Sequence, residues 1–204
     1  MYAVELFGTA IFAITGVLAV SRRGLDLIGA LVLGLVTAVG GGTVRDVLMR
    51  YQVFWFEDVN YIWAALGGAA IAFFLSALIR NAYRALLYLD ALGAALFAIA
   101  ATNKGLLDPT LSGSVAVILG VLTGIGGGLL RDVLAGRQTL LMSRDIYATP
   151  ILLGCALYVT LLEVTPGFEH AALCSATLIF ALRAAAIWFH LEMFDWLVQG
   201  EPPS

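Results

Sequence analysis

The chain has 204 residues, of which 61% are hydrophobic and only 12% are charged. Soluble domains are about 45–50% apolar and about 25% charged, so this composition excludes an ordinary soluble protein and indicates an integral membrane protein. The formal net charge of −3 is small and the basic residues are scattered, so we expect no nucleic-acid partner. The apolar runs are continuous and of helical length, which predicts an all-α membrane protein and not a β-barrel.

Seven stretches have the length and apolarity of a transmembrane helix. In chain order they are residues 2–20, 27–48, 61–79, 85–102, 113–134, 149–164 and 171–191. Cys155 and Cys174 fall inside two of these stretches, where cysteine behaves as a small apolar residue. We therefore expect no disulfide and no metal site.

The basic residues of the connecting loops predict the orientation. Alternate loops carry most of them, namely Arg22, Arg23, Arg80, Arg84, Arg137 and Arg144. The loops on the opposite side carry only Arg50 and Lys104. Because cytoplasmic loops are enriched in lysine and arginine, we expect the N-terminus outside and the C-terminus in the cytoplasm.

A repeat runs through the first six predicted helices. The sequence GGGTVRDVL at 40–48 recurs 86 positions later as GGGLLRDVL at 126–134. Upstream, with an offset of 85, Glu5, Gly8 and Phe12 recur as Asp90, Gly93 and Phe97. Each repeat contains an odd number of membrane helices, three, so the second copy enters the membrane from the opposite face. We expect two inverted repeats, 1–84 and 85–165, followed by a seventh helix and tail in 166–204.

The two glycine runs are the candidate functional element. Each glycine costs a helix about 1 kcal/mol relative to alanine, so bending or local unwinding is expected there. If the two helices cross near the membrane midplane, their carbonyls and two threonine hydroxyls form a narrow polar constriction suited to a cation. The residues concerned are Thr37, Gly40, Gly41, Gly42, Thr123, Gly126, Gly127 and Gly128. Alternatively, the small residues only let helices pack closely.

An arginine and an aspartate follow each glycine run, Arg45 with Asp46 and Arg131 with Asp132. Adjacent residues on a helix do not face each other, so each arginine is expected to pair with an acid on another helix, a lipid phosphate or exposed carbonyls. These residues then frame the two mouths of a pore. Alternatively, the arginines extend to the lipid headgroups.

Three further charged residues are candidates. Glu5 and Asp90 begin corresponding predicted helices, where an acid either complements the helix dipole or attracts cations to a mouth. Arg183 lies well inside the seventh predicted helix. A charge at that depth needs a partner within the protein or a water-filled cavity, and the sequence does not identify one.

The doubled Gly-Gly-Gly-x-x-Arg-Asp-Val-Leu, together with Phe7-Gly8-Thr9-Ala10, resembles the prokaryotic relatives of the trimeric intracellular cation (TRIC) channels. The resemblance covers nearly the whole chain. It implies a homotrimer in the plasma membrane, in contact with lipids, with a potassium-permeable pore in each protomer. The second and fifth helices of that family kink at these glycines and line the pore. Animal members bind phosphoinositide near the second kink, where Arg131 is the nearest counterpart, but here only a generic lipid contact is expected.

The resemblance therefore implies a monovalent cation channel with no cofactor, whose ligands are the permeant K⁺ or Na⁺ ions. One alternative is a secondary transporter of a small amino acid such as glycine, because inverted repeats with broken helices also serve carriers. Another is a structural or lipid-interacting membrane protein. An enzyme is not expected, because the sequence offers no nucleophile and base pair and no metal-ligand set.

Overall fold

The computed structural model describes residues 2–21, 24, 26–76, 79 and 81–192. These residues form eight α-helices: α1 (Tyr2–Val20), α2 (Leu27–Leu48), α3 (Phe54–Glu57), α4 (Asn60–Leu75), α5 (Ala82–Leu106), α6 (Gly113–Leu134), α7 (Ala148–Val164) and α8 (Ala171–Phe189). Seven of them correspond to the seven predicted stretches, and the one-turn helix α3 was not predicted. Arg22, Arg23, Arg80 and residues 193–204 of the predicted tail lie outside the described part of the chain.

Five of the described helices are long and apolar enough to cross a membrane, namely α1, α2, α5, α6 and α8. The apolar helices α4 and α7 are shorter, with 16 and 17 residues. At about 1.5 Å per residue each spans roughly 25 Å, which is less than the roughly 30 Å of a bilayer's hydrocarbon core. The prediction of an all-α membrane protein is confirmed.

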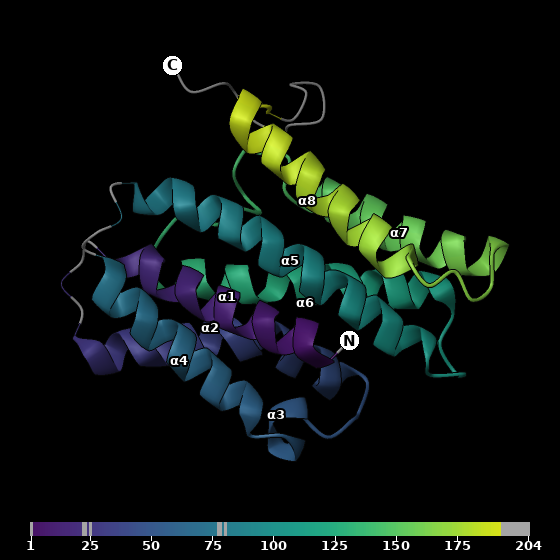
Figure 1. The fold of residues 1–204 in the computed structure, drawn as a ribbon, viewed down its shortest axis with the longest axis horizontal. Coiled ribbons are helices and arrows are strands. Elements are labelled where there is room, and N and C mark those ends of the chain that lie inside the picture. The colour runs from purple at the N-terminus through teal and green to yellow at the C-terminus, as the bar shows by residue number, and fades with distance from the viewer. Residues whose placement is uncertain (1, 22–23, 25, 77–78, 80, 193–204) are drawn as a thin grey trace.

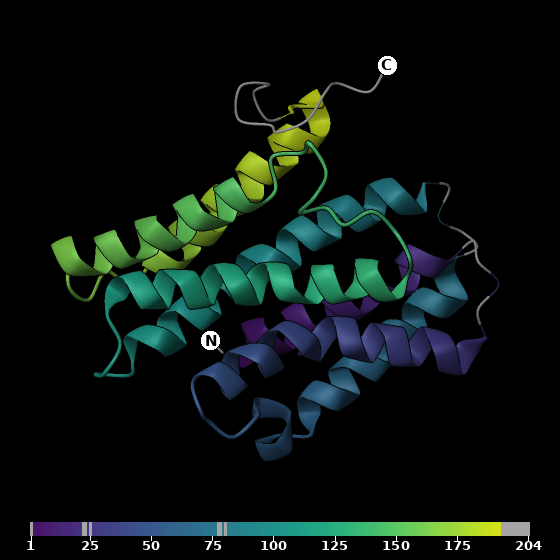
Figure 2. The same cartoon turned by 180° about the vertical axis from the view of Figure 1, so that it is seen from behind.

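Four long helices form the centre of the molecule, with α1 against α2 and α5, and α6 against α2 and α5. The helix α4 packs on α1 and α2, while α7 packs on α5 and α6. Figures 1 and 2 show α3 and α4 on one side of this centre and α7 and α8 together on the opposite side. The helix α8 packs on α5 and α7.

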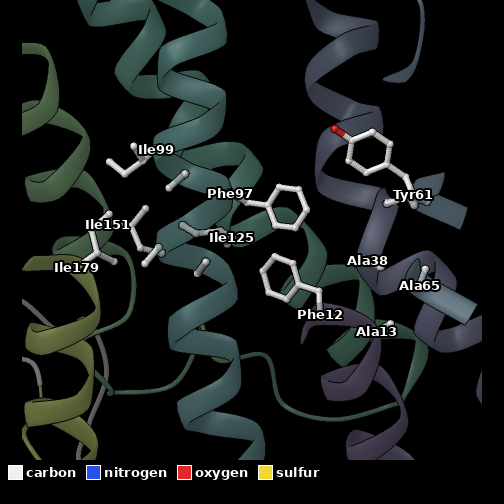
Figure 3. Close-up of a cluster of buried hydrophobic side chains, with 14 of the residues drawn as sticks. Phe12, Ala13, Ala38, Tyr61, Ala65, Phe97, Ile99, Ile125, Ile151 and Ile179 are labelled. Atoms are coloured by element: carbon white, nitrogen blue, oxygen red, sulfur yellow. The ribbon is translucent and has the colours of Figure 1, made fainter. Parts of the chain in front are cut away.

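The contact between α1 and α5 is reciprocal under the sequence offset of 85. The rings of Phe12 and Phe97 stack with 5.4 Å between their centroids and 12° between their planes. Figure 3 shows the two side chains pointing toward each other. A Cβ at Gly8 would lie 3.2 Å from the Phe97 ring, and one at Gly93 would lie 3.1 Å from the Phe12 ring. Gly8 of α1 therefore makes room for the Phe97 ring of α5, and Gly93 of α5 makes room for the Phe12 ring of α1.

The helices α2 and α6 also begin and end alike. Asp26 accepts a hydrogen bond from the Gly29 amide at 2.8 Å, and Ser112 at the equivalent position accepts one from the Val115 amide. After each helix one residue adopts a left-handed conformation, Arg50 with φ 56° and Gly136 with φ 56°. Such a residue at a helix C-terminus is usually glycine, because a Cβ is unfavourable there.

The loops gather at two ends of the bundle. At one end Tyr2 donates to Asp58 at 2.6 Å, and Tyr51 donates to Asp108 at 2.6 Å. The hydrogen bond from Tyr2 lowers the pKa of Asp58, and hydrogen bonds from Thr110 and then Tyr51 lower the pKa of Asp108. The other end brings the last residues of α1 next to the start of α5 and the loop after α6, around a cavity of about 280 Å³.

Candidate functional site

The glycine runs lie within uninterrupted helices. Both α2 and α6 are continuous α-helices through residues 40–42 and 126–128, so the expected local unwinding is not present. Gly40, Gly41, Gly42, Gly127 and Gly128 are buried against neighbouring elements. Backbone groups released from a helix there would have no water to bond, which explains why the helical hydrogen bonds persist.

The helices α2 and α6 touch backbone to backbone at the glycines. A Cβ at Gly41 would collide with the Thr123 carbonyl oxygen, and one at Gly127 would collide with the Thr37 carbonyl oxygen. These two contacts correspond to each other under the offset of 86. We call this place the glycine crossing, and its packing matches the alternative of close helix approach.

The threonine hydroxyls at the glycine crossing bond within their own helices. Thr37 donates to the Leu33 carbonyl at 2.7 Å, and Thr123 donates to the Leu119 carbonyl at 2.7 Å. Both side chains are buried. The two hydroxyls therefore line no open constriction in this structure, and the crossing is closed.

At the end of α2, three charged residues form what we call the Asp46 site. Asp46 Oδ1 accepts hydrogen bonds from Arg45 Nε at 2.8 Å and from Lys104 Nζ at 2.9 Å. The side chains of Asp46 and Arg45 are 0% and 5% exposed, whereas that of Lys104 is 32% exposed. Asp46 Oδ2 accepts from the Phe54 amide at 3.0 Å, so the carboxylate also holds the loop that follows α2.

At the end of α6, the equivalent residues form what we call the Asp132 site. Arg131 Nε donates to Asp132 Oδ1 at 2.9 Å, and Arg131 Nη1 donates to Asp90 Oδ1 at 2.6 Å. Asp132 Oδ2 accepts from the Leu140 amide at 3.1 Å, the counterpart of the Phe54 contact. The side chains of Arg131 and Asp90 are completely buried, and that of Asp132 is 4% exposed.

The structure contradicts the premise that adjacent residues on these helices do not pair, and it contradicts the alternative that the arginines extend to lipid headgroups. Arg45 and Arg131 each pair with the adjacent aspartate, because the long arginine side chain folds back at the helix end and its Nε reaches the neighbouring carboxylate. Neither arginine extends to lipid headgroups, since both are buried. The expected acid on another helix is found for Arg131, in Asp90 of α5.

Glu5 and Asp90 differ in position. Glu5 lies in the first turn of α1 and accepts from the Tyr61 hydroxyl at 2.7 Å. Asp90 lies two turns inside α5, because α5 begins at Ala82 and not at the predicted residue 85. Its role as a first-turn dipole partner is therefore excluded, and it instead neutralises the buried Arg131.

Arg183 is 1% exposed and lies against the residues that precede α7. Its Nη1 donates to the Ile146 carbonyl at 2.9 Å, and its guanidinium carbon lies 4.5 Å from the centroid of the Tyr147 ring. Its Nε and Nη2 have no hydrogen-bond partner among the described residues. The sequence did not identify a partner for Arg183, and the structure shows two, the Ile146 carbonyl and the face of the Tyr147 ring.

Sequence reasoning missed two members of these sites. Lys104 lies near the end of α5. It is the only lysine of the chain, and this rarity was the one sequence signal that could have indicated a role in a site. Thr15 accepts from Arg131 Nη1 at 3.1 Å, and nothing distinguishes it in sequence from other threonines of the apolar helices. Within the described residues, no three His, Cys, Asp or Glu side chains come together as a metal site.

The fold and these sites define a multi-pass α-helical membrane protein with two equivalent Arg-Asp sites on either side of a close helix crossing. The family model described as "Glycine transporter" matches residues 2–77 and 87–163. The UPF0126 inner membrane protein YadS of Escherichia coli K12 is 36% identical over 196 residues, covering 95% of this chain and 94% of the relative.

Two solved structures are similar. One is the TRIC trimeric intracellular cation channel orthologue from Rhodobacter sphaeroides, with a TM-score of 0.89, 40% identity, and coverage of 93% of this chain and 98% of that one. The other, described in work on conductance through TRIC cation channels, has a TM-score of 0.83, 27% identity, and coverage of 98% and 99%. The chain belongs to the prokaryotic TRIC family, which confirms the resemblance read from the doubled motif. It is an integral protein of the cell membrane.

Proposed function

We propose that this protein is a monovalent cation channel, permeable to K⁺ or Na⁺, with a pore inside each protomer. The observation that carries the proposal is the reciprocal contact of Gly41 and Gly127 at the glycine crossing, with one Arg-Asp site toward each end of the helix pair. The likeness at 40% identity to a protein described as a cation channel supports the same function.

The glycine crossing is the constriction of the proposed pore. It is closed here, so conduction requires α2 and α6 to bend or move apart at their glycines. A small separation exposes the carbonyl oxygens of Thr37 and Thr123, which now face the opposite helix. Carbonyl oxygens replace part of a cation's hydration shell in selective pores.

The two Arg-Asp sites give the proposed mouths different charges. The Asp46 site places two cationic groups against one carboxylate, and the Asp132 site places one guanidinium against two carboxylates. Rings of charge at pore mouths tune the local concentration of permeant ions. In this proposal Glu5 attracts cations near the Asp46 site, and Asp90 contributes negative charge at the other mouth.

We also propose seven membrane helices in two inverted repeats, 1–84 and 85–165, with α8 standing outside them. Arg84, Arg137 and the predicted loop residue Arg144 then face the cytoplasm, and the N-terminus lies outside. A homotrimer is proposed because the similar protein from Rhodobacter sphaeroides is a TRIC trimeric intracellular cation channel orthologue. Each protomer then carries its own pore and contacts membrane lipids.

Reconstitution of the purified protein in planar bilayers tests the channel. We expect discrete current steps in KCl that carry about 10⁶ ions per second or more, far above an enzyme-like turnover of about 1–10³ per second. Replacing K⁺ by a large organic cation is expected to abolish the steps. A membrane that stays silent over a range of voltages would contradict the proposal.

A second candidate function is a secondary transporter of glycine, favoured by the description of the matching family model. Alternating access uses the same inverted repeats and places the substrate near the midplane. Proteoliposomes loaded with and without an ion gradient distinguish the two. Saturable, gradient-dependent uptake of labelled glycine without current steps would favour the carrier over the channel.

A further inference from the structure

A separate cavity lies where α5 begins and α8 ends. Its volume is about 340 Å³, and its polar lining comprises Asn81, Arg84, Asp145, Arg183, His190 and Glu192. None of these residues belongs to the glycine crossing, the Asp46 site or the Asp132 site. The cavity therefore needs its own explanation.

Arg183 supplies the observation that points to a ligand. Arg183 is among the residues that line the cavity, although it is only 1% exposed, and its Nε and Nη2 have no hydrogen-bond partner within the described part of the chain. Buried charged donors are rarely left without an acceptor. The planar fork of an arginine matches the two oxygens of a phosphate or a carboxylate.

The cavity also carries negative charge at its rim. Asp145 and Glu192 both line it and are joined by an antiparallel backbone bridge, so the two acids are held at the same edge. The second arginine of the lining, Arg84, lies with its guanidinium carbon 5.3 Å from the Trp188 ring centroid. Two guanidinium groups and two carboxylates in one cavity complement a ligand that has both an anionic and a cationic group.

The position of the cavity favours a lipid over a water-soluble ligand. It lies at the ends of two membrane-length helices, beside the exposed apolar side chains of Trp188, Phe189 and Leu191. Tryptophan is enriched at the level of the lipid headgroups, and neighbouring apolar side chains meet the acyl chains. A phospholipid headgroup at the membrane surface is therefore the ligand that we expect at this cavity.

We propose that this cavity binds the headgroup of a zwitterionic aminophospholipid. The exposed Arg84 holds the phosphate, the buried Arg183 adds positive charge to the same cavity, and the carboxylates of Asp145 and Glu192 hold the ammonium group. The proposal does not depend on whether the protein is a channel or a carrier, because it concerns a surface of the fold remote from the glycine crossing.

Native mass spectrometry of the full chain in detergent, with phosphatidylethanolamine or phosphatidylglycerol added, tests this proposal. We expect the wild type to retain phosphatidylethanolamine in preference to phosphatidylglycerol. The Arg84→Gln variant, whose substitution is at an exposed side chain, is expected to bind phosphatidylethanolamine about tenfold more weakly, the effect of one charge-assisted hydrogen bond. Arg50→Gln, at the opposite end of the bundle, is the matched control and is expected to bind as the wild type does.

The acidic edge is tested separately. The double variant Asp145→Asn with Glu192→Gln is expected to lose the preference for phosphatidylethanolamine while still binding phosphatidylglycerol. Equal lipid binding by the wild type, Arg84→Gln and Arg183→Lys would overturn the proposal. So would binding of free phosphoethanolamine or free glycine as tight as that of the lipid, since a soluble zwitterion would then be the ligand.

Discussion

The Asp46 site and the Asp132 site have the same local sequence and different surroundings. In both, the arginine bonds the adjacent aspartate, and the aspartate holds a backbone amide eight residues later. The third partner differs, because α5 supplies Lys104 to the first site and Asp90 to the second. The first site is therefore cationic and partly open to solvent, whereas the second is anionic and buried.

The doubled motif has two structural roles. Its glycines permit the backbone contact between α2 and α6. Its aspartate ties each helix end to the following loop, through Phe54 in one half and Leu140 in the other. The net charge of each site is set outside the motif, by Lys104 of α5 at the Asp46 site and by Asp90 of α5 at the Asp132 site.

The largest expected difference follows removal of the two arginines. Arg131→Met leaves Asp90 and Asp132 buried without a cation, and breaking such a pair costs about 3–5 kcal/mol. Arg45→Met is expected to cost less, about 1–2 kcal/mol, because Lys104 still neutralises Asp46. Thermal unfolding of both variants in one detergent measures this. Equal losses would contradict the difference between the two sites.

The helix ends provide a second comparison. Gly136→Ala places a Cβ on a residue with φ 56° and is expected to destabilise the protein by about 1 kcal/mol. Arg50→Gly at the equivalent position relieves the same strain and is expected to stabilise by up to about 1 kcal/mol. The same unfolding measurement checks both. A stabilising Gly136→Ala would show that the two ends are not equivalent.

Lys104 provides a third test, which rests on the proposed channel. Its ion pair is partly exposed, so Lys104→Met is expected to change stability by less than about 1 kcal/mol. Loss of its positive charge is expected to raise the single-channel conductance in dilute KCl, because a cation near the mouth repels K⁺. The increase should vanish near 1 M salt, where the Debye length is about 3 Å. An increase of the same size at high salt would contradict the electrostatic explanation.

The smallest expected effect is the pH dependence of the loops at the Asp46 end. The pKa values of Asp58 and Asp108 lie below their usual 3.8, because tyrosine and threonine hydroxyls bond the ionised carboxylates. Their contribution to stability is therefore present at neutral pH and is lost as the pH falls below about 3.8. The difference between the melting temperatures of the wild type and of Asp58→Asn with Asp108→Asn should narrow as the pH falls below about 3.8. A difference that stays constant would contradict this.

Much of the fold was predictable from the sequence. Apolar length located the helices, and α1, α2 and α6 have the predicted bounds. The offset of 85–86 relates Phe12 to Phe97 and Gly41 to Gly127, and the structure places the two members of each pair in contact. The sequence predicted the crossing of the two glycine helices but not the contact of the two rings. The one-turn helix α3 was missed, since four residues are too few for hydrophobic periodicity to mark.

The sites were less predictable, because their contacts depend on side chains from distant parts of the chain. The pairing of Arg131 with Asp90 joins residues 41 positions apart, and the sequence indicated only that some acid was needed. The expected unwinding at the glycines failed because helix propensity is a weak guide where a second helix covers the backbone. The sequence placed Lys104 in a loop, whereas it lies in the last turn of α5. Its pairing was missed because its partner, Asp46, lies in another helix of the opposite half.

The most direct test of the central claim is single-channel recording of Gly41→Ala with Gly127→Ala. Both methyl groups would enter the glycine crossing, whereas Gly67→Ala, where a Cβ meets nothing within 4 Å, is the matched control. We predict current steps reduced roughly tenfold, equivalent to about 1.4 kcal/mol on the barrier for ion passage, with the folded state retained. The control should conduct as the wild type does. Full conductance in the double variant would contradict a pore at the glycine crossing. The only remaining role of Gly41 and Gly127 would then be close helix packing.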